Sequence, residues 1–469
     1  MKYPTHINVN NIVFSMENKE EKNFATKIGF ILASAGSAIG LGNLWRFPYL
    51  AEQNGGGIFL LVYIILVVTF GFTLLITELT IGRRTGKSCI SAFGSVSEKH
   101  RWIGYLAILP PLIILPYYVV IGGWVLKYLF EYATGGGMAV ASSGYFNDFI
   151  GCSMDSILDG PFIWFLIFGF LVLFFVARGI QSGIEKLSKV LMPILLILLI
   201  GLTVYTLAQP NGIDAAVDFL TPDFSKFSAA TVLDATGQLF YSMSLAMGIM
   251  ITFGSYMKKD VPIEKSTRQI SIMDTSVAIL AGLLIVPAVA IFSSAEISSG
   301  PGLMFMTLPA VFQSMPGGDI VGLAFFVLVL FAALTSAMSL AETLVYPLME
   351  KIKVKRLTAV AIVAAIVLVL GSLSCFGYGP LSGFTILGLQ MLDFFDFISN
   401  SVVMPIVAIL TCLFVGFVVG TKFISDEIES SGPFKTKKFY GFMVKWVAPI
   451  LLVAILVMGI SSTFGIQLF

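Results

Sequence analysis

The chain has 469 residues, of which 57% are hydrophobic and 12% charged, and its net charge is +1. Because soluble domains carry about 25% charged residues, this composition excludes a soluble protein and predicts one that crosses a membrane many times. The sequence contains no stripe of basic residues of the kind that binds nucleic acid. The cysteines and histidines show neither metal-binding spacing nor a Ser-His-Asp set, so we expect no zinc site and no enzyme.

Residues 1–27 are polar and of mixed charge. They lack the apolar core and cleavage site of a signal peptide, and we expect a cytoplasmic tail. The rest of the chain contains hydrophobic segments long enough to cross the bilayer core. Eleven are predicted, at 28–50, 58–82, 103–130, 161–178, 186–208, 231–257, 270–293, 318–349, 358–376, 393–420 and 443–463.

Positive charges are distributed unevenly between these spans. If the N-terminus lies inside, Lys and Arg gather in the inner segments, whereas the outer segments hold only Lys226. The long outer segment 132–160 contains no Lys or Arg. Since cytoplasmic loops carry an excess of these residues, we predict a cytoplasmic N-terminus and, with an odd number of spans, a C-terminus outside.

The first span contains AGSAIGLGNLWRFP at 35–48, which does not suit a plain membrane anchor. Each glycine costs about 1 kcal/mol of helix propensity relative to alanine, and a charge such as Arg46 costs at least about 2.5 kcal/mol at mid-membrane. The glycines alone could serve close helix packing. Together with Asn43 and Arg46 they indicate a helix that breaks, so that free carbonyls can bind a cation and a half-helix N-terminus can meet an anion.

The sixth span carries a second interruption, GQLFYSMSLAMGIM, with Ser242 and Ser244 in an otherwise apolar helix. Two broken helices, five spans apart, indicate an inverted repeat with a binding site near the bilayer midplane. The predicted organisation is a first repeat over 28–208, a second inverted repeat over 231–420 and an additional helix at 443–463.

Three blocks carry a family resemblance: GSAIGLGNLWRFPYLAEQNGGGIF at 36–59, GQLFYSMSL at 237–245 and ALTSAMS at 333–339. They resemble the first, sixth and eighth helices of the neurotransmitter:sodium symporter family, in its bacterial amino-acid transporter branch. The resemblance covers nearly all of the first ten spans. It implies an all-α membrane protein with a LeuT-type 5+5 inverted repeat, which takes up an amino acid or amine together with sodium.

The resemblance also implies two sodium sites, built from the oxygen ligands that this hard cation requires. The first site maps onto Ala38, Asn43, Ser242 and Asp274. The second maps onto Gly36, Ile39, Ala332, Thr335 and Ser336. Taken without the resemblance, the hydroxyls of Thr335 and Ser336 would more often bond back to the carbonyl four residues earlier.

Asp274 lies in an apolar run, SIMDTSVAIL, and an intramembrane carboxylate is by default a functional-site hypothesis. Chloride-dependent animal relatives carry an uncharged residue at this position, and bound chloride supplies the charge. We therefore expect chloride-independent transport here. Once sodium leaves, the carboxylate could bind a proton and carry it through the return step of the transport cycle. This would be proton antiport. The alternative is a structural Asp that is always protonated.

The substrate pocket implied by the resemblance is mostly apolar. Its residues are Ser37, Ala38, Gly40, Leu41, Gly42, Ile114, Tyr118, Tyr241, Ser242, Ser244, Met247, Ser336 and Leu340. Tyr118 matches the tyrosine that holds the substrate carboxylate, although it could instead be an interfacial tyrosine. The apolar members could equally be ordinary core. Deformable Met247 among them favours a hydrophobic amino acid, branched or aromatic.

Arg46 and Asp396 match the family's outer gate, with Asp393 as a rival partner and Tyr241 as the aromatic lid. On the inner side Glu350 matches an acidic gate residue. Its usual arginine partner is missing, since Glu21 stands in that place and Phe24 replaces the accompanying tryptophan. Lys22 or Lys19 could substitute as the cation.

These expectations amount to a sodium-coupled, chloride-independent symporter that imports a hydrophobic amino acid by alternating access. The alternative from another class is a non-transporting amino-acid sensor, or a channel, on the same fold. We expect a multi-pass protein of the cell inner membrane, whose partners are its small-molecule substrate and the lipid bilayer. No obligate protein partner is expected.

Overall fold

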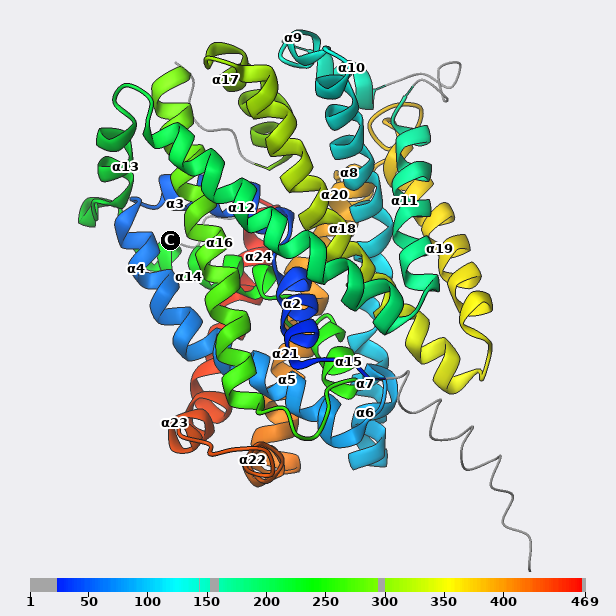
Figure 1. Cartoon of the computed structure of the whole chain (residues 1–469). Helices are drawn as coiled ribbons and strands as arrows, with labels where there is room; N and C mark the ends of the chain where they lie inside the picture. Colours follow the sequence, from blue (N-terminus) through cyan, green and yellow to red (C-terminus); the bar gives the residue numbers. More distant parts are fainter. Residues whose placement is uncertain (1–22, 143, 152–159, 294–299, 466–469) are drawn as a thin grey trace, which may run out of the picture.

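The computed structural model describes residues 23–142, 144–151, 160–293 and 300–465. Within these ranges the chain is a bundle of helices, and the only β-type pairing there is two isolated bridges, Gly56–Pro222 and Ile386–Leu389 (Figure 1). The predicted all-α class is confirmed.

In the described part of the chain, eight helical stretches are long and apolar enough to cross a membrane, and each lies at a predicted span. They are α4–α5 (Gly57–Thr85), α7–α8 (Glu98–Ala133), α12 with the turn before it (Ile180–Leu207), α16 (Ile263–Phe292), α18 (Gly318–Lys351), α19 (Arg356–Phe376), α20–α21 (Met391–Val418) and α23–α24 (Lys437–Thr463). The fourth predicted span is a shorter helix, α11 (Pro161–Ala177). Small helices connect these elements: α6 (Cys89–Val96), α9 (Gly137–Val140), α10 (Tyr145–Ile150), α13 (Gly212–Leu220), α17 (Leu308–Ser314) and α22 (Thr421–Glu429).

The first predicted span is broken where its glycines indicate. α2 (Lys27–Ala38) ends, and a second piece continues at an angle of 53°; it contains the π-helical turn η1 (Gly42–Arg46) and α3 (Phe47–Gln53). At the break the backbone N–H of Gly40 donates to Oδ1 of Asn43 at 3.0 Å. The Asn43 side chain thereby takes up a backbone donor that the interrupted helix leaves free. With this bent pair counted as one, nine stretches of the described chain could span a membrane.

The sixth predicted span is also interrupted, between α14 (Ala229–Ser242) and α15 (Ile249–Ser255). The linking residues include Ser244, Ala246 and Gly248, which adopt left-handed backbone conformations with φ of 52°, 59° and 68°. This conformation costs roughly 1–2 kcal/mol for each residue that is not glycine, so neighbouring groups must hold the break in place. The count of eleven membrane crossings stays a prediction, because α11 and the α14–α15 pair fall short of the length of the others.

The two interrupted helices meet inside the bundle. α2 packs against α12, α16 and α18, and the figure shows it surrounded by these helices (Figure 1). The second piece of each broken helix contacts the first piece of the other, since α15 packs on α2 and α14 on η1. α8, α11 and α19 pack together beside α18. The breaks are therefore enclosed by the long helices.

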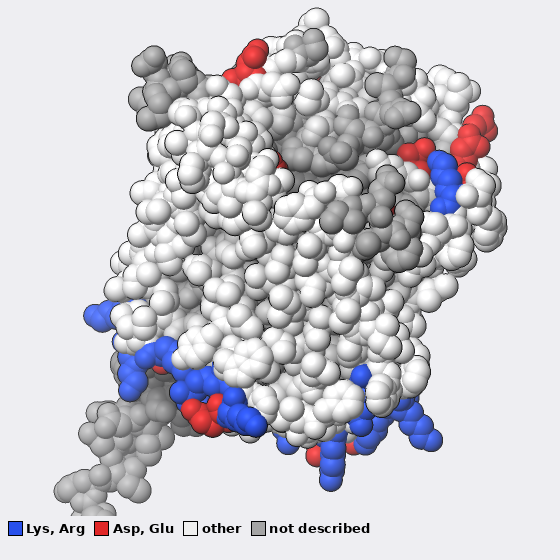
Figure 2. Space-filling view, turned by 180° about the vertical axis from the view of Figure 1, so that it is seen from behind, with Lys and Arg blue, Asp and Glu red and all other residues white. Residues whose placement is uncertain are grey.

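Charge is segregated along the molecule. Lys and Arg gather at one end, and a broad band of the visible surface above it carries almost no charge (Figure 2). Large apolar side chains such as Phe170, Ile197 and Ile450 are about two-thirds exposed, at 67%, 68% and 68%. Such a surface suits lipid rather than water. The cationic end is the one that we predict to be cytoplasmic.

Candidate functional site

A narrow cavity of about 30 Å³ lies where the two breaks face one another. It is lined by Ser37, Ala38, Gly40, Leu41, Gly42, Ile114, Tyr118, Tyr241, Ser242, Ser244, Met247, Ile249, Ser336 and Leu340. The structure thus brings together all the residues that the sequence predicts for a substrate pocket. It adds Ile249, the first residue of α15. In the sequence, the only indication that Ile249 would line the pocket is its position directly after Gly248 in the broken span.

Glycines of the first break make room for this cavity. A Cβ on Gly40 would lie 2.8 Å from Oγ of Ser336 and 3.0 Å from the hydroxyl of Tyr118. A Cβ on Gly42 would lie 2.7 Å from the ring of Tyr241. Any side chain at either position would therefore fill the cavity or displace its walls.

The Tyr118 hydroxyl faces the first break and accepts a hydrogen bond from the N–H of Leu41 at 3.4 Å. Across the cavity, Oγ of Ser244 donates to the carbonyl of Ser37 at 2.9 Å and ties the second break to the first. One end of the cavity is therefore polar, with backbone and hydroxyl groups. Ile114, Met247, Ile249 and Leu340 supply apolar walls.

A buried polar cluster lies next to the cavity, around Asp274 of α16. Nδ2 of Asn43 donates to Oδ1 of Asp274 at 2.8 Å and to Oγ of Ser242 at 2.9 Å. Oγ of Ser242 lies 3.0 and 3.1 Å from the two carboxylate oxygens. Asp274 and Asn43 are fully buried and Ser242 is 2% exposed. In the described part of the chain, no Lys or Arg nitrogen lies within 4 Å of this carboxylate.

Three of the four residues predicted for the first sodium site are therefore in direct contact. The fourth, Ala38, lines the same cavity as Ser242. A buried carboxylate costs free energy unless a cation or hydrogen bonds compensate it. The cluster combines a negative charge with amide and hydroxyl oxygens, the ligand types that hard cations take.

A second oxygen cluster lies between α18 and the end of α2. Oγ of Ser336 lies 3.3, 3.2 and 3.2 Å from the carbonyl oxygens of Gly36, Ser37 and Ile39. These carbonyls belong to the last turn of α2 and the residue after it, where the helical pattern ends. The Ser336 hydroxyl lies within hydrogen-bonding distance of all three, and the Ser37 carbonyl also accepts from Ser244.

The Thr335 hydroxyl bonds back within its own helix, which is the alternative to sodium binding that the sequence left open. Its Oγ1 donates back within α18, to the carbonyls of Phe331 at 3.0 Å and Ala332 at 3.1 Å. Its Cβ nevertheless faces α2, since a Cβ on Gly36 would lie 3.2 Å from it. Four of the five residues predicted for the second sodium site, Gly36, Ile39, Thr335 and Ser336, thus lie at this contact between α2 and α18. The fifth, Ala332, is buried in α18 one turn earlier, where its carbonyl accepts from Thr335.

Comparisons with known proteins agree with this geometry. A family model described as "Sodium:neurotransmitter symporter family" matches residues 21–137 and 139–467. The chain belongs to this family. The resemblance predicted from three sequence blocks is confirmed, and the protein is a sodium-dependent transporter rather than an enzyme.

Individual relatives cover nearly the whole symporter. An uncharacterized sodium-dependent transporter of Bacillus subtilis, YhdH, is 34% identical over 95% of this chain and 100% of its own. The sodium- and chloride-dependent GABA transporter 2 of the rat is 25% identical, over 87% of this chain and 75% of its own. The solved structure of MhsT in complex with L-phenylalanine is 36% identical, covers 93% of this chain and 99% of its own, and has a TM-score of 0.83. The predicted LeuT-type fold is confirmed by this last similarity.

On the predicted outer side of the symporter, Arg46 and Asp396 are not in direct contact. The guanidinium of Arg46 lies 5.8 Å from the centre of the Tyr241 ring. Oδ1 of Asp396 accepts hydrogen bonds from the Tyr117 hydroxyl at 3.1 Å and from Nδ2 of Asn400 at 2.6 Å. These partners hold the carboxylate, so the predicted ion pair is not formed in this structure.

A second cavity, of about 180 Å³, lies on the predicted outer side of Tyr241 and is lined by Arg46, Asn400 and Asp234 among others. Tyr241 lines both cavities. Asp393, the rival partner for Arg46, accepts from the Tyr378 hydroxyl at 2.9 Å instead.

On the predicted inner side, Glu350 accepts hydrogen bonds from the backbone N–H and the hydroxyl of Ser88. The cations predicted as its partners, Lys22 and Lys19, lie outside the described residues, as does Glu21. Phe24 is 1% exposed and its N–H donates to the carbonyl of Tyr256 at 3.1 Å.

Three buried acidic side chains that the sequence interpretation missed, Glu342, Glu185 and Glu78, accept hydrogen bonds from other elements. Glu342 of α18 is fully buried, pairs with Arg356 and accepts from the Tyr256 hydroxyl at 2.8 Å. Glu185 accepts from the N–H groups of Ala25 at 2.6 Å and Thr26 at 3.1 Å. The signal was available for Glu342, since ionisable residues inside a span are functional-site hypotheses by default.

Glu78 of α5 is the third missed group. Its Oε1 accepts from the N–H of Ala246 at 2.7 Å, in the middle of the second break. Its Oε2 is buried without a hydrogen-bond partner in the described residues. A carboxyl group on a neighbouring helix therefore supports a backbone conformation that Ala246 would otherwise avoid.

Proposed function

We propose that this symporter imports a hydrophobic amino acid together with sodium, by alternating access and without a need for chloride. The observation that carries the proposal is the buried carboxylate of Asp274 beside the cavity between the two breaks, where its close partners among the described residues are Asn43 and Ser242 rather than a cation. A carboxylate in this setting is stabilised by a bound cation, which the transport cycle supplies and removes.

Two sodium ions are proposed as co-transported substrates. The first would take oxygens of Ala38, Asn43, Ser242 and Asp274, and the second would take oxygens of Gly36, Ile39, Ala332, Thr335 and Ser336. Because Asp274 brings a full negative charge to the first site, no chloride is needed beside the ion. For the second site the Thr335 hydroxyl would turn from its own helix toward α2.

The polar end of the cavity suits the amino and carboxylate groups of an amino acid. The Tyr118 hydroxyl and the half-helix that begins after the first break would hold the carboxylate, since helix N-termini favour anions. The apolar walls favour a branched or aromatic side chain, and the flexible Met247 can adapt to either. MhsT, whose solved complex contains L-phenylalanine, supports this substrate class by its similarity.

Alternating access requires a gate on each side of the cavity. We propose that Tyr241 with Arg46 and Asp396 closes the outer side, and that Glu350 takes part on the inner side with a cation of the N-terminal tail such as Lys22. The repeats 28–208 and 231–420 would supply the two moving parts. Each sodium that crosses 100 mV contributes about 2.3 kcal/mol, so two ions support more than about thousandfold accumulation.

The proposed setting is a cell inner membrane, with the N-terminus cytoplasmic and the C-terminus outside. The distribution of Lys and Arg supports this orientation. A small-molecule substrate and the bilayer are the proposed partners.

Uptake of labelled leucine, tyrosine and phenylalanine into proteoliposomes tests the proposal. We expect accumulation that needs an inward sodium gradient, disappears in potassium and is unchanged when gluconate replaces chloride. Sodium-independent equilibration would instead indicate a channel, and binding without flux would indicate a sensor. A chloride requirement would overturn the role given to Asp274.

A further inference from the structure

A third cavity lies on the flank of the molecule. It shares no lining residue with the two cavities beside the helix breaks. It is a groove of about 450 Å³ between the α4–α5 stretch and α16. Its walls include Val68 and Phe72 on one side and Ile272 and Ile279 on the other. Val68 is 64% exposed and Ile272 57%, so the groove opens outward through apolar side chains. In a membrane such a groove is filled by lipid chains.

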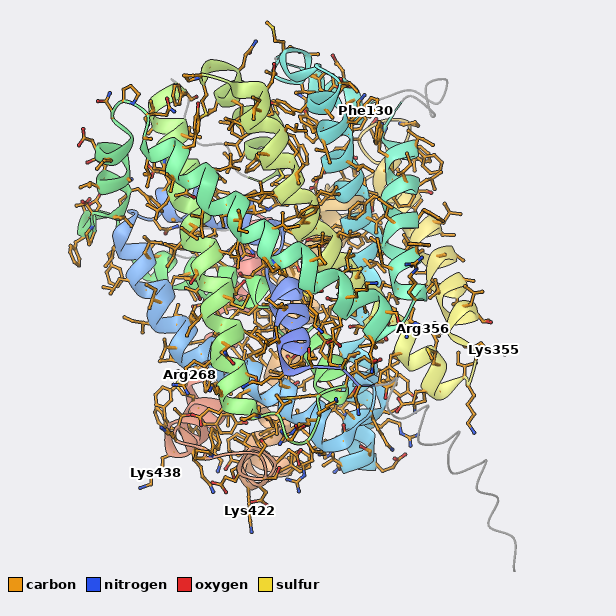
Figure 3. All side chains as sticks on the ribbon, in the orientation of Figure 1. Phe130, Arg268, Lys355, Arg356, Lys422 and Lys438 are labelled. Atoms are coloured by element: carbon orange, nitrogen blue, oxygen red, sulfur yellow. The ribbon has the colours of Figure 1, made fainter. Side chains whose placement is uncertain are left out.

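The groove is shorter than the membrane is thick. Along α16 its wall extends from Glu264 to Ile279, a rise of fifteen residues, or about 22 Å at 1.5 Å per residue. A hydrocarbon core is roughly 30 Å thick, so the groove does not cross the whole membrane. Arg268 lies toward the cationic end of the molecule, on the same flank as Lys438, whereas Phe130 lies near the opposite end (Figure 3). In the proposed orientation the groove therefore begins at the cytoplasmic surface and lies mainly in the cytoplasmic leaflet.

One end of the groove offers a free positive charge. Arg268 is exposed, and its guanidinium makes no hydrogen bond or ion pair with the described residues. Glu264 lines the same end, but its carboxylate is already engaged by the N–H of Lys435 at 3.0 Å and the hydroxyl of Thr436 at 3.2 Å. Glu264 is 8% exposed, so it is turned into the protein. At this end of the groove, the group that can bind a ligand is therefore the guanidinium of Arg268.

We propose that this groove binds an anionic phospholipid of the cytoplasmic leaflet. The guanidinium of Arg268 holds the phosphate, for which its planar fork of donors is suited, and one acyl chain lies between Val68 and Ile272. Exposed Lys265 and Lys438 near the same end favour a headgroup with net negative charge over one that carries its own ammonium group. Basic pockets between membrane helices on the cytoplasmic side are a recurrent setting for such headgroups.

Native mass spectrometry of the purified full chain tests this proposal, with phosphatidylglycerol as the probe and phosphatidylcholine of the same acyl chains as the competitor. We expect one phosphatidylglycerol molecule to be retained in preference to phosphatidylcholine. Arg268→Gln should weaken that retention by about fivefold, the share of one cation near the surface. The matched control is Lys355→Gln, an exposed cation on the opposite flank, which should change nothing (Figure 3).

A second variant tests the apolar part of the groove. Ser276 lines it and is exposed, so Ser276→Trp should fill the space without disturbing the core and should reduce retention of both lipids. Leu368→Trp, at a 46% exposed position of α19, is its control. Equal retention of the two lipids by the wild-type protein, or the same behaviour of Arg268→Gln and Lys355→Gln, would leave only non-specific boundary lipid and overturn the proposal. Neither result depends on transport, so it is separate from the test of the proposed function.

Discussion

Replacement of Asp274 by Asn should weaken sodium binding without rebuilding the site. Asparagine has the same shape, and its side-chain oxygen can still accept from Nδ2 of Asn43 and Oγ of Ser242, which lie 2.8 and 3.0 Å from Oδ1 of the native carboxylate. The hydrogen-bond network therefore keeps its geometry. What the substitution removes is one buried negative charge.

The size of the effect follows from Coulomb's law. A unit charge about 4 Å from a sodium ion contributes about 4 kcal/mol at an effective dielectric constant of about 20. At about 1.4 kcal/mol per tenfold change, the sodium affinity of the first site should fall by about a thousandfold.

The assay is substrate uptake into proteoliposomes as a function of sodium concentration, with either chloride or gluconate as the anion. For Asp274→Asn we expect the half-saturating sodium concentration to move beyond the accessible range in gluconate. Partial recovery in chloride would mean that the anion can enter the space and replace the lost charge. Asp393→Asn is the matched control, because that carboxylate is bonded to Tyr378 and lies outside the cavity. An unchanged sodium dependence of the Asp274 variant in gluconate would refute the reasoning.

Three further substitutions test other parts of the molecule. Gly40→Ala places a methyl group 2.8 Å from Oγ of Ser336, an overpacking of about 1–3 kcal/mol, so substrate affinity measured by binding should fall about five- to hundredfold while the circular dichroism spectrum stays the same. Arg356→Gln leaves the fully buried carboxylate of Glu342 unpaired, at a cost of about 3–5 kcal/mol, and should lower the melting temperature, with recovery when Glu342→Gln is added. Glu185→Gln removes charge-assisted hydrogen bonds of about 1.5–3 kcal/mol from the N-terminus of α2, and hydrogen exchange of its first turn should become at least about tenfold faster; unchanged exchange would show that this contact does not hold the helix.

The fold and the position of the breaks could be predicted because they depend on local costs. Glycines, Asn43 and Arg46 in one apolar span are expensive in a continuous helix, and the structure breaks that span at Ala38. Asp274 is similarly conspicuous, since a carboxylate in an apolar run needs partners. The hydrogen bonds from Asn43 and Ser242 provide them.

Side-chain partners across the bundle could not be predicted in the same way. The family resemblance implies that Arg46 and Asp396 pair, but here Tyr117 and Asn400 hold the carboxylate, because the contact depends on the conformation of the gate. Glu78 illustrates a different limit. Its role depends on the backbone of Ala246, and no spacing in the sequence brings those two residues together.

The break in the first helix and the proposed first sodium site depend on the same side chain. Oδ1 of Asn43 accepts from the N–H of Gly40 and so stabilises the end of α2, while its Nδ2 donates to Asp274 and Ser242. An amide oxygen has two lone pairs, so Oδ1 can serve the backbone and an ion together. A cation at this position would therefore strengthen the same contacts that fix the broken shape of the helix and with it the wall of the substrate cavity. Loss of the ion would loosen both, and this gives a direct physical route by which sodium occupancy and substrate affinity are coupled.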